Sequence, residues 1–143
     1  MRVMNLFRIN TFRLYGIVAC LLLASTNLLA DDTVPKEVNL IINGSRLVAS
    51  NIRFSRFDTL RLNAQEKIRE RAEAKGVILI VTNQRIIGYG VSSGWKDLKT
   101  QAGEKIESVS VEDYAAFVVT DSRYLNFNGE TGLWGKQDRR TER

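Results

Sequence analysis

The sequence contains no histidine and only one cysteine in 143 residues. That cysteine is Cys20, within the first thirty residues, so the chain beyond it can form no disulfide and must be stabilised by packing. The same stretch lacks the groups needed for thiol catalysis, for Ser-His-Asp catalysis and for metal sites built from histidine or cysteine. No EF-hand spacing of carboxylates is present either. We therefore expect no metal site and no cofactor.

The first thirty residues differ in composition from the rest. Arginines without acidic residues precede the apolar run "LYGIVACLLLAST", Leu14 to Thr26. Such a run is typical of a secretory signal peptide and is shorter than the about 20 apolar residues of a transmembrane helix. We predict a signal-peptide helix at 1–30, cleavage after Ala30, and export to the periplasm or cell envelope. The alternatives are secretion, a retained leader, and lipidation of Cys20, and only the last two would hold the chain on a membrane.

Little net charge remains once the leader is set aside. The whole chain carries a formal charge of +5, and the leader accounts for three arginines of that total. Much of the remaining positive charge lies in the tail "KQDRRTER", Lys136 to Arg143. Few aromatic residues accompany these charges to stack on bases. We therefore predict that the protein does not bind nucleic acid.

A repeat is the main positive feature of the sequence. The stretch "VTNQRIIGY" returns as "VTDSRYLNF", and the match continues upstream without a gap, so that Glu66–Arg85 aligns with Glu104–Arg123. A fainter copy places Arg46 39 residues before Arg85. Fixed self-similarity at this period indicates one supersecondary unit used repeatedly. We predict one domain over 31–143, with units at about 37–75, 76–113 and 114–143.

Each unit is predicted to contain four short strands. "VILIVT" and "YAAFVVT" are β-branched runs of strand length, and each is followed by a two-residue turn and a return strand. The turn residues "GS", "NQ" and "DS" begin with types that tolerate positive φ, as tight hairpins require. "WKDLKT" and "EKIESVSVE" are interpreted as the third and fourth strands.

One segment carries conflicting signals. "NAQEKIRERAEAKG", Asn63 to Gly76, has helical composition with a capping Asn and a terminal Gly. Its gapless partner in the next unit, "QAGEKIESVSVEDY", has strand composition. Because repeats share a backbone more reliably than a propensity, we predict a strand here, with a helix as the alternative.

The fold expected from these units is all-β. Three tandem four-stranded meanders would form a propeller-like partial ring, because closed propellers typically use four to eight such sheets. A β-trefoil, which closes with three units, is the alternative.

The sequence pattern of the repeat resembles that of a known kind of protein. "VTNQRIIGYGVSSGW" and "VTDSRYLNFNGETGLW" resemble the repeats of uncharacterised, exported, β-propeller-like proteins of bacteria. In these repeats a strand ending in VT is followed by a turn, an Arg, two apolar residues, an aromatic and a GxW. The resemblance covers about 105 residues and implies an all-β repeat fold, without indicating a substrate.

The third unit ends before its "EKI" strand. A shortened unit would leave unpaired strand edges, and open edges favour pairing with another chain. We therefore expect self-association, or docking against a protein partner that supplies a strand. The alternative is that the charged tail and 31–37 cover these edges.

Two recurring sets of residues are candidates for ligand binding. The first, Arg46, Arg85 and Arg123, would bind a carboxylate or phosphate if the guanidinium groups converged. The simpler interpretation is that each arginine lies along its strand and pairs with a neighbouring carboxylate.

The second set is aromatic and consists of Phe57, Trp95 and Trp134. Trp95 and Trp134 would act as platforms for a sugar ring in a lectin-like, glycan-binding domain. The interpretation we favour is that all three are the large core residue that closes each unit, because an apolar position kept as Phe or Trp suits packing. Tyr89 and Phe127 are interpreted in the same way.

Catalysis would have to use carboxylates alone. Glu107, Glu112 and Asp113 are the candidates for glycoside hydrolysis, which needs two separated carboxylates in a cleft. These residues lie in a polar strand expected to be exposed, so we predict that the protein is not an enzyme. The function expected from the sequence is a non-catalytic, exported binding or assembly module of the cell envelope. A glycan-binding domain and a carboxylate hydrolase are the alternatives.

Overall fold

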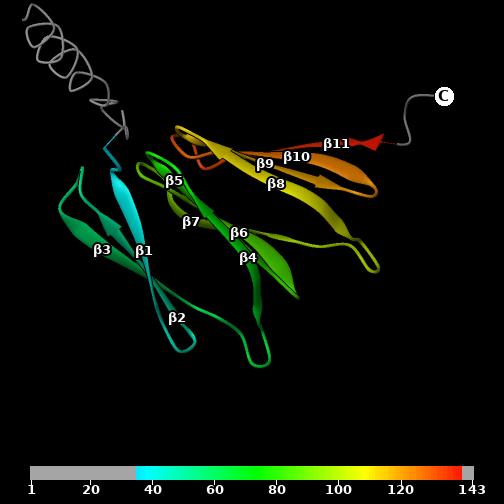
Figure 1. Cartoon of the computed structure of the whole chain (residues 1–143), viewed down its shortest axis with the longest axis horizontal. Coiled ribbons are helices and arrows are strands. Elements are labelled where there is room, and N and C mark those ends of the chain that lie inside the picture. The colour runs from blue at the N-terminus through cyan, green and yellow to red at the C-terminus, as the bar shows by residue number, and fades with distance from the viewer. Residues whose placement is uncertain (1–34, 140–143) are drawn as a thin grey trace, which may run out of the picture. The chain divides into compact units, whose positions relative to one another are not determined.

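A computed structural model of the protein describes residues 35–139, which form eleven strands in three antiparallel sheets (Figure 1). Sheet A contains β1 (Val38–Asn43), β2 (Arg46–Asn51) and β3 (Arg56–Arg61). Sheet B contains β4 (Ile68–Glu73), β5 (Val77–Thr82), β6 (Arg85–Gly90) and β7 (Gly94–Lys99). Sheet C contains β8 (Ile106–Glu112), β9 (Ala115–Thr120), β10 (Arg123–Asn128) and β11 (Trp134–Asp138). Each sheet is a meander, so the all-β repeat prediction is confirmed.

The sheets are open over the part of the chain that the structure describes, which excludes the trefoil alternative there. None of residues 35–139 belongs to a helix long and apolar enough to cross a membrane. The predicted signal peptide, its cleavage site and Cys20 lie outside this range.

The segment with conflicting signals is a strand, as predicted. β4 pairs with β5 from Ile68, opposite Thr82, to Glu73, opposite Ile78. Ile68 packs against the apolar cluster between sheets A and B. Tertiary pairing and burial therefore override the helical composition of this segment, because propensity is the weaker effect.

The grouping of strands differs from the predicted units by one strand. "EKI" strands β4 and β8 each begin the next sheet instead of ending the previous one. The reason is loop length: two residues, Asp113 and Tyr114, separate β8 from β9, whereas 100–105 separate β7 from β8. Short connections favour antiparallel pairing of consecutive strands. Consequently sheet C has four strands, and sheet A has three among the described residues, which corrects the prediction of a shortened third sheet.

Sheet B lies between the other two sheets. One apolar cluster joins it to sheet A and a second joins it to sheet C. The strand β5 is buried on both faces, with Ile78 and Ile80 towards sheet A, and Val77 and Leu79 towards sheet C. The continuous apolar run "VILIVT" is therefore explained by two packed faces. In Figure 1, β4–β7 accordingly run between β1–β3 and β8–β11.

The hairpin turns differ in backbone conformation: one uses a glycine with positive φ and two use side-chain hydrogen bonds. Gly44 has φ +59°, as predicted for a tight turn after β1. Asn83 and Asp121 do not have positive φ. Instead each accepts a backbone hydrogen bond at its side-chain oxygen, from Lys67 at 2.7 Å and from Lys105 at 3.1 Å. The prediction of positive φ was wrong at these two positions, where the side chain stabilises the neighbouring loop.

Candidate functional site

The recurring arginine of sheet B is part of a buried turn. Arg85 begins β6, and its Nε and Nη2 donate to the two carboxylate oxygens of Glu66 at 2.9 and 3.1 Å. The Thr82 hydroxyl donates to Glu66 at 2.9 Å and accepts the backbone amide of Arg85 at 2.9 Å. The backbone amide of Asn63 donates to the second oxygen of Glu66 at 2.7 Å. The side chain of Glu66 is fully buried, so this bidentate pair is a structural element.

Sheet C contains the same arrangement. The Nε and Nη2 of Arg123 donate to Glu104 at 2.8 and 2.6 Å, and the Thr120 hydroxyl donates to it at 2.8 Å. The backbone amide of Gln101 donates to Glu104 at 2.7 Å. Burial alone would raise the pKa of the Glu104 carboxyl, but these hydrogen bonds together outweigh burial and lower the pKa to about 2. Glu104 is therefore a carboxylate at neutral pH and has its partners within the fold.

The third arginine lies in a different setting. Arg46 begins β2 and is exposed, and no ion pair joins it to another described residue. Glu66 and Glu104 each precede their arginine by 19 residues, whereas the residue 19 positions before Arg46 is Asn27. Arg85, by contrast, also donates from Nη2 to the backbone carbonyl of Arg61 in sheet A, at 3.3 Å. The three arginines share a backbone position, but the structure does not bring them together around one ligand.

The two tryptophans pack against aromatic neighbours. Trp95 contacts Tyr89 with ring centroids 4.9 Å apart, and its indole N–H donates to the Asp58 carbonyl at 3.0 Å. Trp134 contacts Phe127, also at 4.9 Å between centroids. Both tryptophans are half-buried at the margins of the apolar clusters, where they join one sheet to the next.

Phe57 occupies the corresponding position in sheet A but is 69% exposed. The register establishes the correspondence: Phe57 lies opposite Ser50, as Trp95 lies opposite Tyr89 and Trp134 lies opposite Phe127. The prediction that Phe57 is a core residue was therefore wrong. Tyr89 and Phe127 are fully buried, as predicted.

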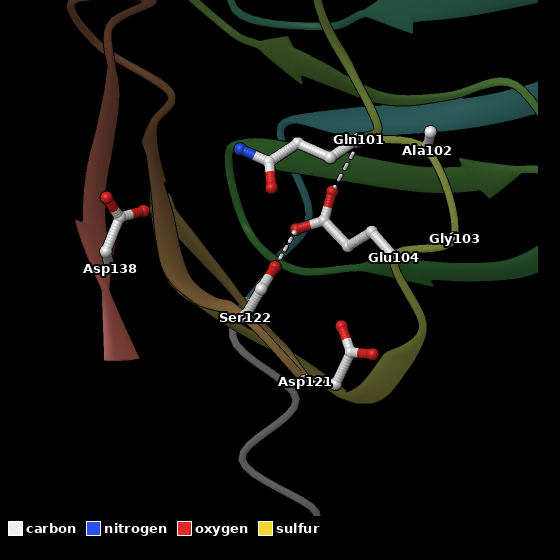
Figure 2. A pocket seen from close by; sticks show the side chains of 7 residues that line it. All are labelled: Gln101, Ala102, Gly103, Glu104, Asp121, Ser122 and Asp138. Atoms are coloured by element: carbon white, nitrogen blue, oxygen red, sulfur yellow. Dashed lines mark hydrogen bonds between the residues drawn. The ribbon is translucent and has the colours of Figure 1, made fainter. Parts of the chain in front are cut away.

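A hollow of about 470 Å³ lies beside the buried turn of sheet C (Figure 2). Its polar lining includes Gln101, Glu104, Asp121, Ser122 and Asp138. As Figure 2 shows, Glu104 is hydrogen-bonded to Ser122 and to Gln101 inside this lining. Asp121 accepts the Lys105 amide. No cluster of potential metal ligands occurs within 35–139, and Glu104 and Asp121 are bonded within the turn.

The three carboxylates considered for hydrolysis are all exposed. Glu107 makes a surface ion pair with Arg139 at 2.6 Å and is 48% exposed. Glu112 is exposed at the end of β8, and Asp113 occupies the following turn with φ 42°. None of the three lines the hollow beside the turn of sheet C.

Several structural residues were not singled out from the sequence. Glu66 and Glu104 carry a signal that could have been used, namely their constant spacing from the recurring arginines. Asn51 is 1% exposed and donates from Nδ2 to the Tyr89 hydroxyl at 2.8 Å and to the Val91 carbonyl at 2.7 Å. It thereby links sheet A to sheet B, and nothing in its local sequence distinguishes it.

The candidate site that emerges is a surface, the outer face of sheet A. Along β2, Leu47 and Ala49 face sheet B, so Val48 and Ser50 face away from it. Ile41 and Phe57, opposite them on β1 and β3, extend this face. Ile52 lies just beyond the end of β2 and is 57% exposed. We define the outer face of sheet A by Ile41, Val48, Ser50, Ile52 and Phe57.

The positions of this face correspond to core positions in sheet B. Their counterparts in sheet B are Ile80, Ile87, Tyr89, Val91 and Trp95, all within the cluster that packs against sheet A. In sheet A the same positions are exposed or half-buried, with Ile41 49% exposed. An apolar face of this kind on a folded domain is typical of an interaction site.

The chain was also compared with known proteins. No protein-family model matches the sequence, and no curated protein shows significant similarity to it.

Proposed function

We propose that the protein is a non-catalytic, exported assembly module of the cell envelope that docks another protein surface onto the outer face of sheet A. The observation that carries this proposal is the exposure of Ile41, Ile52 and Phe57 at positions that are core in sheet B. The equivalent face of sheet B packs against another sheet within the chain, which supports a sheet as the docking partner. Export rests on the leader sequence.

The chemistry of the described residues supports a non-catalytic role. The two buried ion pairs of the described residues are both bidentate, Glu66 with Arg85 and Glu104 with Arg123. Their charged groups are therefore already paired within the fold. A buried pair of this kind is costly to break and holds its loop in place. The exposed outer face of sheet A supports a role in docking.

A site-specific photo-cross-linker at Phe57, in cells that produce the full chain, tests the proposal. Docking predicts one discrete cross-linked product of higher mass, which is absent when the cross-linker is at Ala102. Ala102 is exposed in the loop between β7 and β8, and it lies on neither outer face of the stack. Absence of a discrete product at Phe57 would contradict docking through this face.

A further inference from the structure

The outer face of sheet C complements the outer face of sheet A. On β9 and β10, Val118 and Leu125 face sheet B, so Phe117, Val119 and Tyr124 face away from it. Phe117 is 41% exposed and Tyr124 is 45% exposed. We define the outer face of sheet C by Phe117, Val119, Tyr124 and Asn126.

The repeat indicates what this second face would pack against. The counterparts of Phe117 are Leu40 in sheet A and Leu79 in sheet B, and each of these packs against the following sheet. The surface they contact consists of the same positions that form the outer face of sheet A. Each chain thus presents both halves of the interface that already occurs twice inside it, between sheets A and B and between sheets B and C.

From this equivalence we infer that the partner on sheet A is a second copy of the chain, which docks the outer face of its sheet C there, head to tail. This inference rests on the proposed docking function and names its occupant. Two chains related by a twofold axis would form two such interfaces. They would supply six sheets, within the four to eight that closed propellers use.

A hollow on sheet C is placed to receive Phe57. Trp95, the counterpart of Phe57, stands over the Asp58 carbonyl of sheet A. The counterpart of Asp58 in sheet C is Gly135, since Asp58 lies opposite Ala49 and Gly135 lies opposite Asn126. A hollow of about 310 Å³, lined by Tyr124, Asn126, Gly135 and neighbouring residues, opens on this face. The Asn126 side chain already fills the space next to Gly135, so an aromatic ring would enter the hollow beside Asn126.

A hydrogen bond of the internal interface also has a counterpart. Asn128 occupies the position of Asn51, which donates to the Val91 carbonyl of the next sheet. The corresponding carbonyl on the second copy is that of Ile52. Asn128 Oδ1 accepts the amides of Glu130 and Thr131, as Asn51 Oδ1 accepts that of Phe54, so Nδ2 is the group turned to the interface in both.

A contact from an arginine to a backbone carbonyl has a counterpart at the other end of the interface. Arg85 reaches across to the carbonyl of Arg61 in sheet A. The counterpart of Arg85 on the outer face is Arg46, and the counterpart of Arg61 in sheet C is Asp138. Head-to-tail packing therefore places the exposed Arg46 near the backbone carbonyl of Asp138. Packing sheet A against sheet A would instead bring together the arginines at positions 46 and 61, which lie opposite each other within the sheet.

The inference is tested by expressing the full chain, purifying the protein that accumulates, and measuring its molecular mass in solution. Head-to-tail pairing predicts twice the mass of one chain at micromolar concentration. Phe57→Glu and Phe117→Glu each predict a single chain, whereas Ala102→Glu, which adds the same charge in an exposed loop, keeps the pair. Circular dichroism confirms that each variant is folded, which is expected because both phenylalanines are substantially exposed.

Mixing the two variants tests the polarity of the interface. Phe57→Glu retains an intact sheet C face and Phe117→Glu retains an intact sheet A face, so their mixture regains a two-chain species that neither forms alone. If Phe117→Glu alone still pairs, the chains pack sheet A against sheet A and the inference fails. A single-chain mass for the unmodified protein also overturns it. Combined with a discrete Phe57 cross-link to a different protein, that result would leave the proposed docking function intact.

Discussion

Replacing Glu104 by Gln should lower the free energy of unfolding by about 3 kcal/mol at pH 7. The hydrogen bonds from Arg123, Thr120 and the Gln101 amide lower the pKa of Glu104 from an ordinary 4.5 to about 2. At about 1.4 kcal/mol for each pKa unit, this corresponds to about 3 kcal/mol of folding free energy. The side chain is 1% exposed, so solvent screens the interaction little.

The same reasoning fixes the direction of the pH dependence. The pKa of Glu104 is lowered on folding, so its contribution is complete above the unfolded value near 4.5 and is lost as the pH falls towards 2. The unmodified protein should therefore lose stability between about pH 5 and pH 2. The stability of Glu104→Gln should fall less steeply over this pH range. The loss of stability that remains is expected from Glu66, whose pKa is also lowered on folding.

Urea unfolding followed by tryptophan fluorescence measures the effect. It is best performed in the Phe57→Glu background, where association of chains does not contribute to the apparent stability. Glu107→Gln is the matched control, because the surface pair of Glu107 with Arg139 is expected to contribute at most about 1 kcal/mol. A loss below 0.5 kcal/mol for Glu104→Gln, roughly that of a neutral surface substitution, together with an unchanged acid profile, would refute the assignment of this pair to the scaffold.

Three further substitutions test the packing. Thr120→Val removes the hydroxyl that accepts the Arg123 amide and should cost about 1–2 kcal/mol in urea unfolding; an unchanged midpoint would contradict the turn geometry. Gly88→Ala should cost about 1–3 kcal/mol, because the added Cβ would lie 2.7 Å from the Phe127 ring, and Phe127→Leu in the same chain should recover part of that loss by relieving the contact. Asn51→Ala leaves the Val91 carbonyl without its donor and should cost about 2 kcal/mol by thermal unfolding, whereas a neutral effect would mean that Asn51 does not link the sheets.

Sequence comparison within the chain predicted the backbone better than local propensity did. The strand at β4 followed from its gapless partner at β8, although its composition is helical. The equivalence of Arg85 and Arg123 followed from the same alignment, and both amides are bonded to a threonine hydroxyl three residues earlier. These features depend on the repeated backbone, which an internal repeat reports directly.

Other features depend on neighbours that a repeat does not identify. A repeat gives a period but not the point where one sheet ends, so β4 and β8 were grouped with the wrong sheets. Phe57 matches Trp95 in position and type, but its burial depends on whether another sheet lies against it. The outer face of sheet A could be recognised only after the strands were placed in their sheets.

The double burial of β5 has a consequence for the unfolded chain. "VILIVT" has no charge, no proline and no glycine, and it consists almost entirely of β-branched residues. Six-residue segments of this type are typical nuclei of amyloid-like stacks when they are left unprotected. The segment that joins the two clusters is therefore also the greatest aggregation hazard while the protein is being synthesised. The cations that bracket it, Lys75 and Arg85, stand where gatekeeper charges oppose such stacking.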